Sequence, residues 1–180
     1  MVTGLLFIKP EICMRCSFYF SRQWRENSYS VAVMMNEIYN RKILELAANI
    51  PLVGRLENPM ASATRHSKLC GSTVTVDLDM AAGRVSRFGH EVKACALGQA
   101  ASSIMARHVL GATGDELKTL LKQVRAMLKE GGKPPEAPWD DVAVLEPVRD
   151  YKARHASTLL TFEAVVEAVE QIEAAGSTSP

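Results

Sequence analysis

Two cysteines in the middle of the chain are the residues best suited to metal or sulfur chemistry. Cys70 comes just before a segment with strand periodicity, and Cys95 follows a second segment of the same kind. A hairpin returns the chain on itself, so a residue that enters its first strand and one that leaves its second lie at the same end of the sheet. We therefore expect the two sulfur atoms to be neighbours.

The surroundings of Cys95 favour its reactive form. Lys93 lies two residues before it, and a predicted helix begins just after it. A nearby cation and the free amide groups of a helix N-terminus both favour a thiolate, which is the form that binds metal. Spacing alone still favours the simpler interpretation that Cys70 and Cys95 are small buried hydrophobic residues, because no Cys-x-x-Cys pair occurs in the central part of the sequence.

A histidine near the end of the chain is a further candidate ligand. Arg154 and His155 precede a strongly amphipathic segment, so the imidazole is predicted to lie at the N-terminal mouth of a helix. The neutral imidazole favoured there is a good ligand for iron or zinc. A lone histidine is more often a capping or solvated residue, and by itself it does not identify a site.

The other potential ligands are weaker candidates. Cys13 and Cys16 have the spacing of a metal-binding pair, but no second pair accompanies them and they lie in the least periodic part of the chain. His66 is close enough to Cys70 in sequence to be a candidate for contacting a metal ligand there rather than the metal itself. Otherwise His66 is predicted to be a surface or packing residue. The same prediction applies to His90 and His108.

Composition excludes several classes of function. The chain has 180 residues, 21 lysines and arginines and 20 aspartates and glutamates, so its charge offers no long-range attraction for nucleic acid or for an anionic membrane. No apolar stretch approaches the roughly 20 residues that span a bilayer. The four cysteines occur without a convincing secretory signal, which predicts reduced thiols and a cytoplasmic protein.

Hydrophobic periodicity predicts an α+β domain in which a small antiparallel β-sheet packs against several α-helices. The sheet is expected to centre on a hairpin with a bulge near Arg87, and residues 51–70 are expected to form a loop with one short edge strand near 52–56. The predicted strands are 72–79 and 85–92, and the predicted helices are 36–50, 97–109, 115–129, 139–148 and a last helix from Ser157.

The ends of the chain are predicted to lie outside this domain. Residues 1–33 have no regular period and are expected to form an irregular or disordered extension, and the native start is predicted to be Met34 or Met35. The domain is expected to span residues 34–176. Residues 177–180 are small and polar and are expected to form a flexible tail.

The sequence around the candidate ligands resembles the U-type iron–sulfur scaffold family, which includes IscU, SufU-like proteins and the N-terminal domain of NifU. The resemblance covers residues 36–175 and implies a fold of the SufE/NifU type. It rests on an ENP-like element, a Cys-Gly before the hairpin, a cysteine that heads a run of small residues, and a histidine motif before the last helix: Glu57-Asn58-Pro59, Cys70-Gly71, Cys95 to Ser103, and Arg154 to Leu159.

The resemblance implies that Cys70, Cys95 and His155 surround one site for a transient iron–sulfur cluster, expected to be [2Fe–2S], and for iron. The implied function is a scaffold or carrier that passes clusters to recipient apo-proteins, with a cysteine desulfurase as a partner. No nucleophile paired with a base and no phosphate-binding glycine loop is evident in the sequence. The protein is therefore not expected to be an enzyme.

Two departures from the family pattern affect the expected ligand set. Ser72 stands where the family has an aspartate, and Ala156 stands where it has a third cysteine. Since a [2Fe–2S] centre usually takes four protein ligands, a fourth is expected from Ser72, His66, water, a small thiol or a partner. Two alternatives stay open: a zinc-binding regulator or activator of a cysteine desulfurase, and a metal-free interaction module on the same fold.

Overall fold

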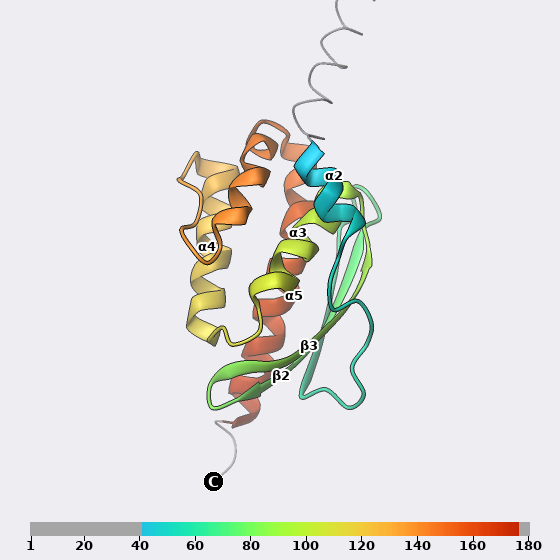
Figure 1. Ribbon diagram of the computed structural model, residues 1–180, viewed down its shortest axis with the longest axis vertical. Helices are drawn as coiled ribbons and strands as arrows, with labels where there is room; N and C mark the ends of the chain where they lie inside the picture. Colours follow the sequence, from blue (N-terminus) through green and yellow to red (C-terminus); the bar gives the residue numbers. More distant parts are fainter. Residues whose placement is uncertain (1–40, 177–180) are drawn as a thin grey trace, which may run out of the picture. The chain divides into compact units, whose positions relative to one another are not determined.

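The computed structural model describes residues 41–176, which form an antiparallel three-stranded sheet with helices packed against it (Figure 1). The strands occur in the order β1-β2-β3, and the α+β prediction is confirmed. Predictions on residues 1–33, the start at Met34 or Met35, and the tail lie outside the described residues. The strands are β1 Ala61–His66, β2 Thr73–Ala81 and β3 Arg84–Lys93; the helices are α2 Arg41–Ala48, α3 Ala96–His108, α4 Gly114–Glu130, the 3₁₀ helix η1 Asp140–Asp150, and α5 Lys152–Gly176.

The predicted hairpin is formed by β2 and β3. Val74, Val76 and Leu78 are fully buried on the face of the sheet that the helices cover. The tight turn between the strands uses positive φ values of 51° at Ala82 and 74° at Gly83, a conformation that glycine adopts without strain. The pairing register shifts next to Arg87, where the sequence predicts a bulge.

Strand β1 lies within a segment that the sequence predicts to be a loop. Its inward residues are only Ala61 and Ala63, which give too weak an apolar alternation to be recognised. Both are buried where α5 packs over β1, so small side chains suit the close approach. The predicted short edge strand near 52–56 is reduced to isolated bridges that Val53 and Gly54 make with His90.

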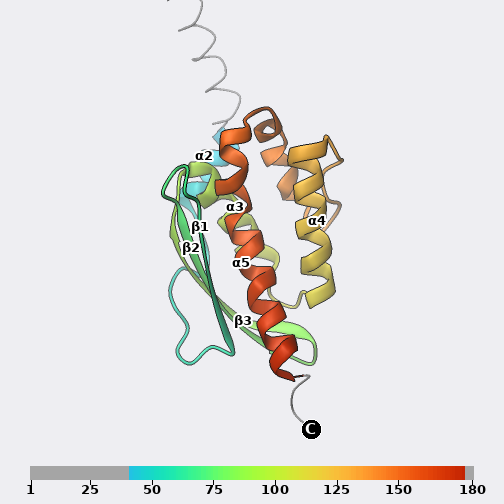
Figure 2. The same cartoon turned by 180° about the vertical axis from the view of Figure 1, so that it is seen from behind.

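The last helix is longer and more buried than predicted. It begins at Lys152 rather than at Ser157, and it runs between the sheet and α4 (Figure 2). Nearly every side chain from Ser157 to Val169 is therefore buried, whereas Glu170 and Glu173 are exposed. Glu163 and Glu167 stand at the edges of the contact and pair with arginines from neighbouring elements.

Helices α3 and α5 approach closely where the sequence has its run of small residues. A Cβ atom at Gly98 would lie 3.0 Å from the carbonyl oxygen of Ser157 and 2.8 Å from the Cβ atom of Ala94. One turn further on, the hydroxyl oxygens of Ser102 and Thr161 are 2.5 Å apart. These contacts fix the start of α3 against the second turn of α5.

Candidate functional site

Cys70 and Cys95 lie at the same end of the sheet. Cys70 is in the turn that leads from β1 into β2, followed by Gly71 with a φ of 68°. Cys95 follows β3 directly and is the N-cap of α3, in an extended conformation. Both residues are free thiols and both are partly exposed, so the hairpin delivers two accessible sulfur atoms to one edge of the domain.

Serine hydroxyl groups surround the Cys70 sulfur. Its Sγ atom lies 3.0 Å from Ser72 Oγ and 3.4 Å from Ser67 Oγ. Burial raises the pKa of Cys70, but hydrogen bonds from Ser67, from the hydroxyl and backbone of Ser72, and from Ser157 outweigh burial and lower that pKa to about 7. A substantial fraction of Cys70 is therefore thiolate at neutral pH, ready to bind metal.

Ser157 connects the two cysteines. Its Oγ atom is 3.6 Å from Cys95 Sγ, and its side chain is also among the groups that lower the pKa of Cys70. The residue is 1% exposed and stands on α5 opposite the start of α3. Sequence reasoning did not select Ser157, although it belongs to the histidine motif; its side chain could be assigned to the thiols only after the helix packing was known.

His155 lies at the N-terminal end of the last helix, as predicted, but not before it. It lies inside the first turn of α5, so the prediction of a residue before the helix is wrong. It is 8% exposed, and its Nε2 atom lies 3.1 Å from the carbonyl oxygen of Val148 and 3.0 Å from that of Arg149. Carbonyl oxygens only accept hydrogen bonds, so Nε2 carries a proton and Nδ1 is the nitrogen left for a ligand role.

The structure thus brings the two cysteines together without His155. Within residues 41–176, no group of three or more histidine, cysteine, aspartate or glutamate side chains is arranged to hold a metal ion. His66 is exposed, and its Nδ1 atom lies 2.9 Å from Thr73 Oγ1. Ser72 does lie beside Cys70, whereas the Cys13 and Cys16 pair is outside the described residues.

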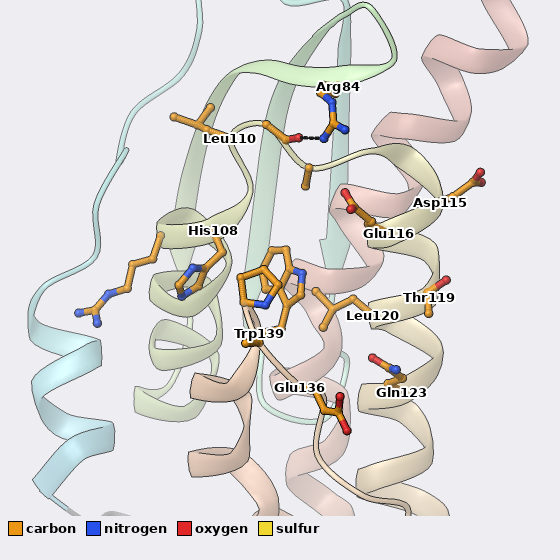
Figure 3. Close-up of a pocket in the computed structure, with 15 residues that line it drawn as sticks. Arg84, His108, Leu110, Asp115, Glu116, Thr119, Leu120, Gln123, Glu136 and Trp139 are labelled. Carbon is orange, nitrogen blue, oxygen red and sulfur yellow. Dashed lines mark hydrogen bonds between the residues drawn. The ribbon is translucent and has the colours of Figure 1, made fainter.

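A separate pocket of about 770 Å³ lies between the end of α3, the first half of α4 and the segment before η1 (Figure 3). His108 and Trp139 form one wall, with ring centroids 5.5 Å apart. Arg84 also lines the pocket, and this residue begins β3, whereas Cys95 follows the end of that strand. The pocket therefore belongs to the opposite end of the hairpin and contributes no thiol to the candidate site.

The fold and the thiol pair define an α+β domain with a cysteine site at one edge of its sheet. Residues 38–158 match the family model described as the NifU-like N terminal domain, and the chain belongs to this family. The resemblance predicted from the sequence is thereby confirmed.

Three relatives illustrate the match. A crystal structure of a nitrogen-fixing NifU-like protein (N-terminal) from Brucella abortus is 60% identical, with a TM-score of 0.77, over 78% of this chain and 98% of that one. The iron–sulfur cluster assembly scaffold protein IscU of Thermotoga maritima is 24% identical over 75% of this chain and 94% of its own length. A putative SUF-system scaffold, SufU, from Fervidobacterium islandicum shares the fold, with 22% identity and a TM-score of 0.69 over 74% of this chain and 98% of that one.

Proposed function

We propose that this protein is a scaffold for iron–sulfur cluster assembly and not an enzyme. The observation that carries the proposal is the convergence of Cys70 and Cys95 at one partly exposed edge of a NifU-like fold. The name of the Thermotoga maritima relative supports the same function. The zinc-dependent regulator and the metal-free module are not favoured, because the Thermotoga maritima relative is named as a cluster assembly scaffold.

The cluster is the cargo of the proposed site, and the described side chains suit its temporary binding. Cys70 supplies a thiolate near neutral pH, and the serine hydroxyls that lower its pKa also stabilise negative charge on the sulfur. Cys95 supplies the second sulfur donor, from the N-cap position of α3. Partial exposure of both sulfurs leaves a path for iron and sulfide to enter and for the cluster to leave.

The predicted third ligand, His155, remains part of the proposal. Ligation by this residue requires Nδ1, because Nε2 donates to two backbone carbonyl groups. These bonds fix the ring in one tautomer, as is common for metal-binding histidines. The proposed cargo is a [2Fe–2S] cluster or its iron precursor, which takes sulfur from a cysteine desulfurase and passes to apo-proteins.

The proposed location is the cytoplasm, where free thiols stay reduced. Among residues 41–176, no helix has both the length and the apolar character that a membrane crossing demands. The two thiols of the site are free rather than joined in a disulfide. This redox state suits the binding of iron and sulfide.

Anaerobic reconstitution tests this function. The full chain is incubated with ferrous iron, sulfide and a reductant, desalted, and examined by visible absorption together with iron and acid-labile sulfide analysis. The expected result is cluster absorption with iron and sulfide in equal amounts. A double Cys13→Ser, Cys16→Ser variant is the control for the other two thiols and is expected to retain the cluster. Protein that stays colourless and free of iron contradicts the proposal.

A further inference from the structure

We propose that Ser157 is a further metal-binding residue of this site and holds the incoming metal ion through its hydroxyl oxygen beside Cys70 and Cys95. The inference rests on the proposed function and deepens it. It adds a donor of this chain to the ligands already proposed, Cys70, Cys95 and His155. The ligand is a divalent cation that accepts tetrahedral sulfur and oxygen coordination, such as Fe²⁺ or Zn²⁺.

The distance between the donor atoms fits this role. A tetrahedral metal with bonds of about 2.3 Å to sulfur and about 2.1 Å to oxygen separates these two ligands by about 3.6 Å. Cys95 Sγ and Ser157 Oγ are 3.6 Å apart. Ser72 Oγ lies closer to its cysteine, at 3.0 Å from Cys70 Sγ, which is a hydrogen-bonding distance rather than the separation of two ligands on one metal.

The hydrogen bonds of Ser157 leave its oxygen lone pairs on the thiol side. Its hydroxyl donates to the carbonyl oxygen of Arg154 at 3.0 Å, so the proton points back along α5. The Cys95 thiol donates to the same hydroxyl oxygen. When metal binds, a cysteine that is still protonated releases its proton to water and the serine keeps its own, so a neutral hydroxyl becomes the ligand without further proton transfer.

The packing of the helices holds Ser157 in place before any metal arrives. The side chain is buried, and the backbone of the same residue lies where a Cβ atom of Gly98 would approach to 3.0 Å. Rigid placement of a donor lowers the ordering cost of binding. Since an oxygen donor is harder than the thiolate it replaces, it binds soft metal centres less tightly, which suits cargo that must be released.

Cobalt titration of the full chain under reducing conditions tests the assignment. Tetrahedral Co²⁺ gives visible bands, and each bound thiolate adds a sulfur-to-cobalt charge-transfer band; competition with Zn²⁺ then gives the affinity for zinc. Ser157→Ala is expected to weaken binding about 10- to 100-fold, the range for groups that support a metal site. Ser157→Cys is expected to bind more tightly and to increase the charge-transfer intensity from two thiolates towards three.

Thr158→Val is the matched control. Thr158 is buried in the same turn and donates the same bond to the Arg154 carbonyl at 3.0 Å, and no hydrogen bond links it to either cysteine. Its variant is expected to bind Co²⁺ like the unmodified protein. Thermal unfolding without metal identifies any variant that has lost its fold, and Ser157→Cys still reports on the geometry if Ser157→Ala is unstable.

The outcomes separate this inference from the proposed function. If the unmodified chain binds neither Co²⁺ nor Zn²⁺, the proposed function fails with it. If the unmodified chain binds metal and Ser157→Ala binds equally well, while Ser157→Cys adds no charge-transfer intensity, only the role of Ser157 is overturned. Loss of binding in Ser157→Ala and Thr158→Val alike also overturns it, because the shared bond to Arg154 then explains the effect.

Discussion

The two ends of strand β2 differ in how their polar side chains are paired. At the end that receives Cys70, the thiol has only neutral serine hydroxyls as side-chain partners in the described contacts. At the other end, Asp77 and Asp79 are buried and each pairs with an arginine. Arg55 contacts both carboxylate oxygens of Asp77, at 2.6 and 2.9 Å.

This difference separates structural polar groups from functional ones. A buried carboxylate paired with a guanidinium has its charge neutralised and its lone pairs occupied, so it holds the neighbouring loop in place. A thiol among hydroxyls has its anion stabilised without a bound cation, so a metal ion can still occupy the site. We therefore expect substitutions at the thiol end to change metal binding, and substitutions at the carboxylate end to change stability.

The largest expected effect is the loss of metal at the thiol end. Cys70→Ala or Cys95→Ala is expected to abolish cluster retention, since either change leaves one soft ligand at the site. Iron and sulfide content after anaerobic reconstitution measures this. His155→Ala is expected to weaken retention less, because water or a small thiol can take one position. Full cluster content in Cys70→Ala or in Cys95→Ala would contradict the shared site.

The second effect belongs to the carboxylate end. In the unmodified protein the backbone amide of Leu56 donates to the Asp77 carboxylate at 3.0 Å. Asp77→Ala removes this acceptor and also the ion-pair partner of Arg55. The free energy of unfolding is expected to fall by about 1–3 kcal/mol in urea denaturation. Glu45→Ala breaks the exposed ion pair with Arg41 and is the control, with an expected change below about 0.5 kcal/mol.

Acid should weaken the same contact. Burial raises the pKa of Asp77, but the Arg55, Ser62 and Leu56 bonds outweigh it and lower that pKa below its ordinary value. The stabilisation is therefore complete above the unfolded pKa of about 3.9 and is lost as pH falls through the lower folded value. Asp77→Asn should remove this part of the acid dependence, and an unchanged pH profile of unfolding would contradict the assignment.

A smaller effect is expected on the reactivity of Cys70. Because its pKa is lowered to about 7, the rate of alkylation by iodoacetamide should rise with pH to a midpoint near 7. Ser72→Ala should move this midpoint upwards, since it removes the hydroxyl 3.0 Å from the sulfur. Peptide mass spectrometry resolves Cys70 from the other thiols, and a midpoint that does not move in the variant would show that Ser72 does not support the thiolate.

The smallest expected change is a gain. Ala156→Cys adds a thiol next to Ser157, at the position where the family carries its third cysteine. Clusters are expected to be retained longer against a chelator, as followed by the decay of absorption. Retention equal to that of the unmodified protein would indicate that a side chain at position 156 does not reach the site.

Much of the fold could be predicted from local patterns. The alternation of Val74, Val76 and Leu78 and the turn at Ala82 and Gly83 are local in origin, so the hairpin was found together with its bulge. Strand β1 was missed because alanine at its inward positions gives no strong period, and only the packing of α5 explains why alanine is there. The apolar stripe of α5 predicted the helix, but its start at Lys152 and its burial between the sheet and α4 depend on packing between elements distant in sequence.

The sequence by itself determined that two cysteines flank one hairpin and so lie at one end of a sheet, because hairpin geometry is fixed by local pairing. The sequence also contains the motifs by which the family could be recognised. Only the tertiary structure decided which side chain meets the sulfurs. The close packing of α3 on α5 at Gly98 sets Ser157 against Cys95, while the start of α5 at Lys152 directs His155 Nε2 to backbone carbonyls. These contacts join residues distant in sequence, and local periodicity carries no information about them.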